Sequence, residues 1–328
     1  MLELISFPVY AESLREYNDR EELARSCKAL GCDGLEVIWG GDECWRQLPR
    51  ALTLGYHLVF YPDWLDFWRR DEPALLRKFG SREAWTSFYG GDGREALLTQ
   101  LRADLDRAEA LGARYAVYHV SDVSIEEGYT YRWEHTDEAV IDAAAELLNE
   151  AVGSREPPFP ILVENQWWPG FTFTDPALTA RLLDALHFAN KGILLDTGHL
   201  MNTNTALRTQ AEGAAYIREM LEKNGSLSRE IRAVHLHQSL SGEYVRAHTG
   251  TLPPGLSPDY LTRFGESYGH ILKIDRHEPW TDPCVGELVA RIAPDFLTHE
   301  LTSRGRAERE TAIRTQRTAL WGGKTAER

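Results

Sequence analysis

Two spacings of hydrophobic residues alternate along the chain. Short aliphatic and β-branched runs recur between longer amphipathic stretches. This alternation is typical of parallel βα units, in which helices cover both faces of the sheet and the strands are buried. The predicted strands are residues 2–7, 34–39, 56–60, 115–120, 161–164, 193–197, 233–237 and 296–301.

The longer stretches predict helices, several of which begin after Asp or Thr and end at Gly or Asn, as capped helices do. They are residues 20–30, 94–111, 137–152, 175–186, 209–224 and 285–292. Eight βα units predict an α/β protein with a single (β/α)8 TIM-barrel domain over residues 1–328. A doubly wound open sheet is the alternative, but no GxGxxG or Walker loop follows a predicted strand.

Two connections are too long to be simple loops. Residues 61–93 follow the third predicted strand, and residues 238–273 follow the seventh. Long insertions in compact domains are usually lids or binding loops, so we expect both on the catalytic face of the barrel. The tail, residues 303–328, predicts a basic and polar helix that packs on the barrel and frays at its end.

Charge narrows the range of partners. The chain has 36 Lys and Arg against 50 Asp and Glu, a formal net charge of −14, with 43% hydrophobic residues. This composition is ordinary for a soluble protein, and the negative charge opposes binding to duplex DNA or an anionic membrane.

The start, MLELISFPVY, lacks the basic segment and apolar core of a secretion signal, so we expect a cytoplasmic protein. The four cysteines form no CxxC pair and are expected to be small buried hydrophobes.

Imidazole and carboxylate side chains gather in, or just beyond, the predicted strands. The C-terminal ends of TIM-barrel strands converge on one axis, so these side chains are expected to meet. Burying them together without a cation would be costly. Nitrogen and oxygen donors suit Zn²⁺, Mn²⁺ or Fe²⁺, and a bridging carboxylate can hold two ions. The candidates are His57, His119, Glu164, Asp196, His199, His235, His237 and Glu300.

Taken singly, these residues have simpler interpretations. A lone histidine in a strand, such as His57, is more often a hydrogen-bonded core residue than a ligand. Glu164 is harder to explain that way, because a buried glutamate is rare unless it is paired or coordinated. Strand alternation points His299 outward if Glu300 points inward. It also places His235 and His237 on the same side, which leaves open which of them is a ligand.

Together these residues resemble the xylose isomerase-like TIM-barrel superfamily, which holds sugar isomerases and epimerases as well as endonuclease IV-like phosphodiesterases (AP endonuclease family 2). The resemblance implies a Glu, an Asp, a His and a Glu on the fifth to eighth strands. The matching residues are Glu164, Asp196, His235 or His237, and Glu300. The DTGH sequence adds His199, which the resemblance implies contacts substrate in isomerases and binds metal in nucleases.

The endonuclease IV-like branch implies further ligands. His57 and His119 match its histidines after the third and fourth strands, and IDRHEPW supplies an Asp-x-His element as Asp275 and His277. Every ligand type of a trinuclear site then has a candidate, which favours hydrolysis with two or three ions. This sequence departs from the endonuclease IV-like pattern at three points. The seventh strand reads HLHQ, and the insertion displaces Asp275 and His277 from their expected spacing. His248 is a further candidate for the same ligand role as Asp275 and His277.

The resemblance also implies catalytic roles for Glu164, Glu300 and His199. In a hydrolase, metal ions activate water, and Glu164 bridges two of them. The alternative is a sugar isomerase or epimerase with one ion, in which Glu164 and Glu300 move a proton between adjacent carbons of a ketose. A third hypothesis, a non-catalytic binding barrel, is disfavoured by the complete ligand set.

Aromatic residues after the strands suggest the substrate. Aromatic walls bind flat or apolar ligands, and nearby arginines such as Arg276, Arg69 and Arg70 are candidates to hold a phosphate. We therefore expect a small organic phosphodiester with a partly flat body. A similar subfamily is the cobamide-remodelling phosphodiesterases, which suggests a cobamide nucleotide loop, while the oligomeric state, a homodimer included, stays open. The candidate tryptophans are Trp39, Trp64, Trp68, Trp167, Trp168 and Trp280.

Overall fold

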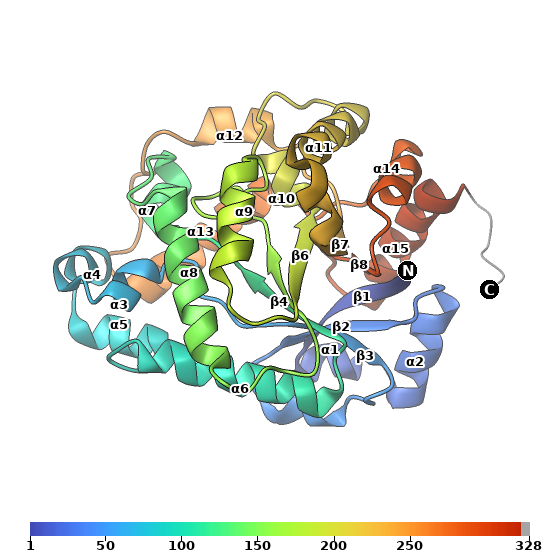
Figure 1. Cartoon of the computed structure of the whole chain (residues 1–328), viewed down its shortest axis with the longest axis horizontal. Helices are drawn as coiled ribbons and strands as arrows, with labels where there is room; N and C mark the ends of the chain where they lie inside the picture. Colours follow the sequence, from blue (N-terminus) through green and yellow to red (C-terminus); the bar gives the residue numbers. More distant parts are fainter. Residues whose placement is uncertain (323–328) are drawn as a thin grey trace.

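The computed structural model describes residues 1–322, which form a closed barrel of eight parallel strands in chain order (Figure 1). Each strand pairs with the next in sequence, and β8 pairs with β1. The predicted (β/α)8 TIM barrel is confirmed. The strands are β1 Leu2–Val9, β2 Gly34–Trp39, β3 Thr53–His57, β4 Tyr115–His119, β5 Ile161–Glu164, β6 Lys191–Asp196, β7 Ile231–Leu236 and β8 Phe296–His299.

The third strand departs most from the prediction. It begins at Thr53 and ends at His57, three residues earlier at each end than the predicted range 56–60. The Val59 backbone N–H donates to Asp104 Oδ2 at 2.9 Å, outside the strand ladder. The Leu58 N–H still donates to the Val117 carbonyl of β4 at 2.9 Å, so the chain leaves the sheet after Leu58 and His57 lies at the C-terminal end of the strand.

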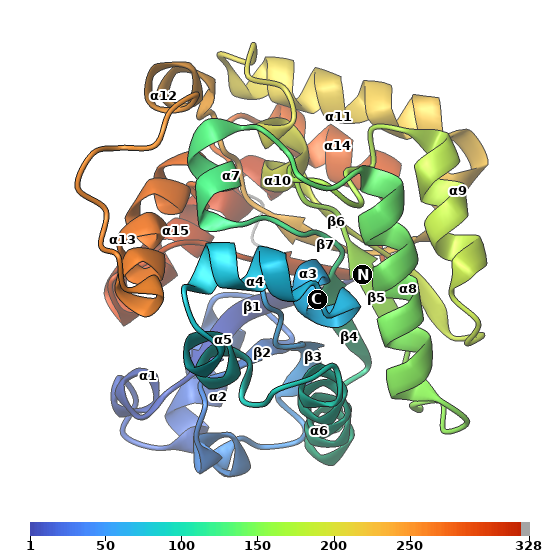
Figure 2. The same cartoon turned by 90° about the vertical axis from the view of Figure 1, so that its left-hand side faces the viewer.

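Helices surround the barrel, as the amphipathic stretches predicted (Figures 1 and 2). Side-chain caps fix several of their starts: the Thr136 hydroxyl accepts from the Ala139 N–H, and Thr209 with Glu212 forms a capping box. The helices after the strands are α1 Ala11–Arg15, α2 Arg20–Ala29, α6 Glu95–Leu111, α8 Asp137–Val152, α9 Pro176–Ala185, α10 Thr197–Asn202, α11 Gln210–Asn224, α14 Cys284–Ile292 and α15 Arg306–Trp321, with 3-10 turns η1 Glu43–Gln47 and η2 Gly225–Glu230.

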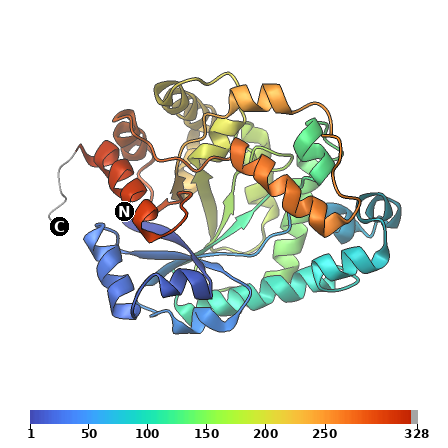
Figure 3. The same cartoon turned by 180° about the vertical axis from the view of Figure 1, so that it is seen from behind.

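The two long insertions fold into helices and pack against each other. Phe79 and Tyr260 stack with ring centroids 3.9 Å apart, and Phe88 meets Phe264 at 5.5 Å. Figures 2 and 3 show the helices α4, α7 and α13 over the same end of the barrel. The elements are α3 Leu65–Arg69, α4 Glu72–Phe79 and α5 Arg82–Tyr89 after β3, α7 Ile125–Thr130 after β4, and α12 Gly242–His248 and α13 Tyr260–Ile274 after β7.

The C-terminal helix α15 packs on the outside of the barrel. Gln316 Nε2 donates to the Leu236 carbonyl at 2.7 Å, and Arg317 pairs with Glu3 at 2.8 Å. The predicted tail helix is therefore present up to Trp321, and residues 323–328 lie outside the described part of the chain. Within residues 1–322, no helix is long and apolar enough to cross a membrane.

Apolar side chains fill the barrel interior toward the N-terminal ends of the strands. Polar side chains occupy the interior at the C-terminal ends. The apolar inner cluster contains Leu4, Leu54, Tyr115, Val117, Leu162, Leu194, Ala233 and Phe296. Two of the four cysteines, Cys27 and Cys32, are buried as predicted, whereas Cys44 and Cys284 are only partly buried. None of the four is in a disulfide bond.

Candidate metal centre

The first group of candidate ligands lies at the ends of three adjacent strands, β3, β4 and β5. His57 Nε2 and His119 Nε2 are 3.0 Å apart. Glu164 Oε2 lies 3.4 Å from the His57 nitrogen and 3.1 Å from the His119 nitrogen. The three donor atoms therefore face a single point, as the ligands of one metal ion do.

Hydrogen bonding fixes which nitrogen of His57 is free. His57 Nδ1 lies 3.0 Å from the Leu58 carbonyl oxygen, which can only accept, so Nδ1 carries the proton in the neutral ring. The lone pair of Nε2 is then directed at His119. Burial lowers the pKa of His119, which favours its neutral form. Burial also opposes a charge on His57, but Glu164 outweighs it and raises the pKa of His57, so an ion binding there competes with a proton. Neutral imidazole is the form that binds metal.

The second group lies on β5 to β8 and is almost completely buried. His235 Nδ1 is 2.9 Å from Glu300 Oε2, 3.4 Å from Glu164 Oε1 and 3.7 Å from Asp196 Oδ2. Glu164 thus offers Oε1 to this group and Oε2 to the first. A carboxylate placed in this way can bridge two ions.

Glu36 on β2 orients His235, and the sequence analysis missed it. Its Oε1 lies 2.7 Å from His235 Nε2, while Oε2 accepts from the hydroxyls of Tyr115 and Thr298. Because Glu36 is fully buried in the run GLEVIW, the argument that singled out Glu164 applied to it equally. A carboxylate behind a ligand histidine fixes the ring orientation and raises its basicity.

The third group joins α10 to β7 and the segment after α13. His199 Nε2 and His277 Nε2 lie 3.2 Å and 2.6 Å from Asp275 Oδ2. The His237 ring stacks on His277 with centroids 3.9 Å apart and an interplanar angle of 9°. His277 takes a left-handed backbone conformation, with φ of 47°, and donates from Nδ1 to the Glu300 carbonyl at 3.0 Å. Asp275 and His277 therefore reach the site despite the long insertion.

His237 lies at the site, whereas His248 does not. His237 Nε2 lies 2.9 Å from Asp196 Oδ2, between the second and third groups, and its Nδ1 has no hydrogen-bond partner within the described chain. The structure thus brings both His235 and His237 to the site. His248 is outside all three groups, because it lies on α12 and stacks on Tyr244 at 4.1 Å. His299 points outward to Glu3 and Gln316, as strand alternation predicted.

The residues fit divalent ions. Several buried polar atoms of the three groups lack a hydrogen-bond partner among residues 1–322, which is costly for buried oxygen and nitrogen. Nitrogen and carboxylate oxygen in groups of three and four are the donors that Zn²⁺, Mn²⁺ and Fe²⁺ accept. The atoms without a partner are Glu164 Oε1 and Oε2, His235 Nδ1, His237 Nδ1 and Glu300 Oε2.

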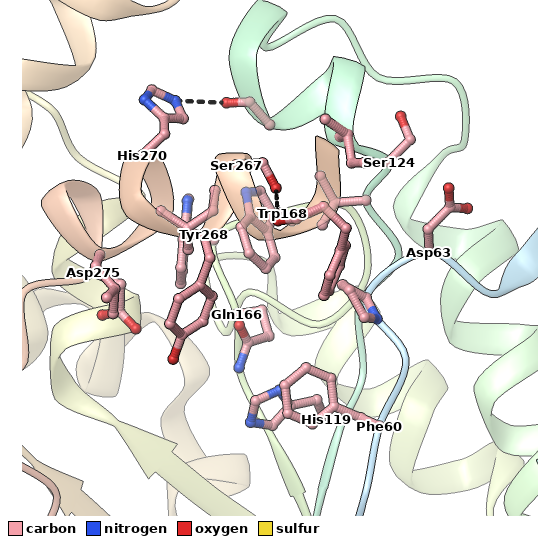
Figure 4. Close-up of a pocket in the computed structure, with 18 of the residues that line it drawn as sticks. Phe60, Asp63, His119, Ser124, Gln166, Trp168, Ser267, Tyr268, His270 and Asp275 are labelled. Carbon is pink, nitrogen blue, oxygen red and sulfur yellow. Dashed lines mark hydrogen bonds between the residues drawn. The ribbon is translucent and has the colours of Figure 1, made fainter. Parts of the chain in front are cut away.

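A cavity of about 390 Å³ opens above the three groups (Figure 4). Its floor is made of candidate ligands from all three groups: His57, His119, His199, Asp275, His277 and Glu300. Its walls include Trp167 and Trp168, whose rings are 4.1 Å apart. Trp167 also lies 5.1 Å from the His199 ring, which places these two tryptophans beside the metal groups.

The other predicted tryptophans do not line this cavity. Trp64 is buried and donates to the Ser121 carbonyl at 2.8 Å. Trp68 is buried and donates to Glu146 on α8. Both anchor the 61–93 segment to the barrel, because their indoles bond to Ser121 after β4 and to α8.

Trp39, Trp280 and Arg276 also make their contacts outside the cavity. The Arg107 guanidinium lies 3.8 Å above the Trp39 ring. Trp280 is fully buried and donates to the His237 carbonyl at 2.8 Å, so it supports β7 from outside the cavity. Arg276 forms an ion pair with Glu278. The cavity wall instead contains aromatic residues that the sequence analysis did not select: Phe60, Tyr129, Tyr260, Phe264 and Tyr268.

Comparisons with solved structures show that proteins of known structure share this fold. Endonuclease IV from Thermus thermophilus aligns with a TM-score of 0.50 and 17% identity over 98% of this chain and 99% of its own. A D-tagatose 3-epimerase-like protein aligns with a TM-score of 0.52 and 16% identity, over 98% and 97% of the two chains. An IolI protein with a bound zinc atom aligns with a TM-score of 0.51 and 14% identity, over 97% and 96%.

These structural similarities, all below 20% identity, concern the fold. The comparison with curated proteins gives no match. A family model described as xylose isomerase-like TIM barrel matches residues 24–316, nearly the whole chain. The chain therefore belongs to the xylose isomerase-like TIM-barrel family, as its strand-end ligands suggested.

Proposed function

We propose that the protein is a metal-dependent hydrolase of a small organic phosphodiester. The observation that carries this proposal is the number of donor groups: three clusters of candidate ligands meet at one cavity, and Glu164 belongs to two of them. A sugar isomerase needs only the cluster of Glu164, Asp196, His235 and Glu300. The additional clusters, with His57 and His119 on one side and Asp275 and His277 on the other, have a clear use in a polynuclear hydrolase.

Divalent ions bound here would supply an activated water and positive charge for a phosphoryl group. The chain's own residues do the rest. Glu164 holds two clusters at a fixed separation, because its two oxygens serve different clusters. Glu300 and His199 face the cavity from the floor and can contact the reacting group. The largely apolar walls exclude water, which strengthens the electrostatic interactions at the floor.

The size of the cavity agrees with a small-molecule substrate, since about 390 Å³ lies in the range of ordinary ligand sites. Trp167 and Trp168 offer indole surface to a flat group beside the ions. The nucleotide loop of a cobamide, which contains one phosphodiester and a flat base, is the specific substrate that we propose to test first.

A sugar isomerase or epimerase is the second candidate. The cluster around His235 alone provides four ligands for one ion, and it is the most buried of the three. In that reaction Glu164 and Glu300 would exchange a proton with adjacent carbons of a ketose. The structural similarity to an epimerase-like protein supports the fold and leaves this choice open.

Metal analysis combined with activity separates the two candidates. We expect two or three ions per chain in protein purified without chelator, and hydrolysis of bis(p-nitrophenyl) phosphate that requires them. The variants Asp275→Ala and His277→Ala should lose one ion and most activity. His248→Ala is the matched control, because His248 lies on the same insertion but outside the three groups. One ion per chain with activity on ketoses, unaffected by Asp275→Ala, would support the epimerase.

A further inference from the structure

The walls of the cavity carry mostly aromatic and aliphatic side chains, with the polar residues Ser124, Gln166, Ser267 and His270, and, within the described chain, no lysine or arginine. Among the same residues, charged lining groups outside the floor are limited to Asp63. The Asp63 carboxylate pairs with Lys78 at 2.8 Å, and Figure 4 shows it directed away from the middle of the cavity. The region above the metal floor is therefore uncharged on the side that a ligand would contact.

Part of this wall is exposed although it is apolar. Tyr268 is 61% exposed, Leu272 40% and Phe60 37%, and all three line the cavity. Figure 4 shows the Tyr268 side chain extending from α13, with its hydroxyl on the side where Gln166 and Asp275 lie. Phe60 lies against the His119 ring at a centroid distance of 3.9 Å. Exposed apolar surface gathered at a cavity marks a site that a ligand covers.

The wall is held rigidly. His270 on α13 lies 3.2 Å from the Gly128 carbonyl through Nε2, which donates, and its Nδ1 accepts from the Tyr244 hydroxyl at 2.9 Å. The His270 ring also stacks on Tyr129 at 4.3 Å. On the other side, Tyr260 stacks on Phe79. Because α13 is tied to α7 and to α4, the wall is formed before a ligand binds.

From this geometry we infer a subsite for a flat, uncharged aromatic group attached to the single phosphate that reaches the metal floor. The inference rests on the proposed function for the phosphate and adds the chemistry of the neighbouring group. Tyr268 is its specificity-determining residue, since its exposed ring at the cavity wall can cover one face of the aromatic group. A polynucleotide is a poor fit, because its flanking phosphates would meet no cationic side chain in the described part of this wall.

Binding to the metal-loaded protein tests the subsite without relying on turnover. We would measure the affinities of 1-naphthyl phosphate, methyl phosphate and 2-naphthol by calorimetry. We expect 1-naphthyl phosphate to bind about tenfold or more tightly than methyl phosphate. Tyr268→Ala should remove most of this difference and leave methyl phosphate unchanged. Tyr268→Phe should keep the ring contribution.

Leu261→Ala is the control, because Leu261 is 51% exposed on the same helix but does not line the cavity. Equal affinities for the two phosphates, or a Tyr268→Ala variant that behaves like Leu261→Ala, would overturn the inference. So would tighter binding of a thymidine tetranucleotide than of 1-naphthyl phosphate. If 2-naphthol binds in a Tyr268-dependent way and methyl phosphate does not bind at all, the subsite stands and the proposed phosphoesterase fails.

Discussion

Three histidines of the candidate metal centre are each oriented by a hydrogen bond from one ring nitrogen. His57 and His277 donate from Nδ1 to the carbonyls of Leu58 and Glu300, and His235 donates from Nε2 to Glu36. These bonds fix the orientation of each ring, so its other nitrogen faces the place of the candidate ions. The backbone and Glu36 thereby prepare the ligands before any ion binds.

Replacing Glu36 tests whether its hydrogen bond to His235 prepares this histidine for metal binding. Glu36→Gln keeps the size of the side chain but can no longer accept from His235, Tyr115 and Thr298 together. We expect metal affinity to fall about 10- to 100-fold, measured by chelator competition. Glu3→Gln is the control, because Glu3 is also a buried strand carboxylate next to a histidine, His299, but on the outside of the barrel. Equal affinities for the two variants would contradict the role of Glu36.

A second residue-scale prediction concerns pH. Burial opposes a charge on His277, but the Asp275 carboxylate outweighs it and raises the pKa of His277 to about 9. In the metal-free protein His277 is therefore protonated at pH 7, and an ion must displace this proton. We expect metal affinity to rise from pH 6.5 to pH 9. Proton release, measured by calorimetry in buffers of different ionisation enthalpy, checks this, and an affinity constant over that range would refute it.

At the scale of elements, a buried lysine holds two parts of the 61–93 insertion together. Lys78 Nζ lies 2.8 Å from Asp63 and 2.7 Å from Asp66, and all three side chains are buried. Removing one partner of a buried ion cluster leaves uncompensated charge, which costs far more than an exposed pair contributes. The internal fold of this insertion therefore depends strongly on one side chain.

The Lys78→Met variant measures this dependence. We expect it to lower the free energy of unfolding by about 3–5 kcal/mol, in urea titrations. Arg77→Ala is the matched control: Arg77 neighbours Lys78 and pairs with Glu134 at 2.9 Å, but it is exposed, so its loss should cost less than about 1 kcal/mol. Similar losses for both variants would show that the buried cluster does not stabilise the insertion.

The strands were largely predictable because buried parallel strands are short apolar runs. The candidate ligands at the ends of these strands were visible in the same runs. Glu164 and Asp196 are examples. The aromatic wall was not predictable in this way. Whether Trp64 or Tyr268 faces the cavity depends on how two insertions far apart in sequence pack together. The spacing of residues within each insertion does not predict this packing. The shift of β3 likewise follows from a tertiary hydrogen bond, Val59 to Asp104.

For the whole molecule, ion binding and stability should be linked. The candidate ligands come from β3 to β8 and include four carboxylates that only the folded chain brings together. A ligand that binds only the folded state stabilises it by about 2.7 kcal/mol at a hundredfold excess over Kd. We expect a chelator to lower Tm and added Zn²⁺ or Mn²⁺ to restore it, measured by calorimetry. An unchanged Tm after verified metal removal would contradict the assignment of these residues as ligands.

The charge of the whole molecule leads to the last prediction, which concerns nucleic acid. Sharing a fold with an endonuclease does not provide the positive surface that a polyanion needs, and this chain has a net charge of −14 and no lysine or arginine among the described residues that line the cavity. We expect a duplex of about 30 base pairs to bind with a Kd above about 10⁻⁴ M at physiological salt, measured by fluorescence anisotropy. The metal-loaded protein must be used, because bound ions add positive charge at the floor. Micromolar binding that weakens steeply with salt would show that DNA contacts a basic surface elsewhere and would reopen a nuclease function.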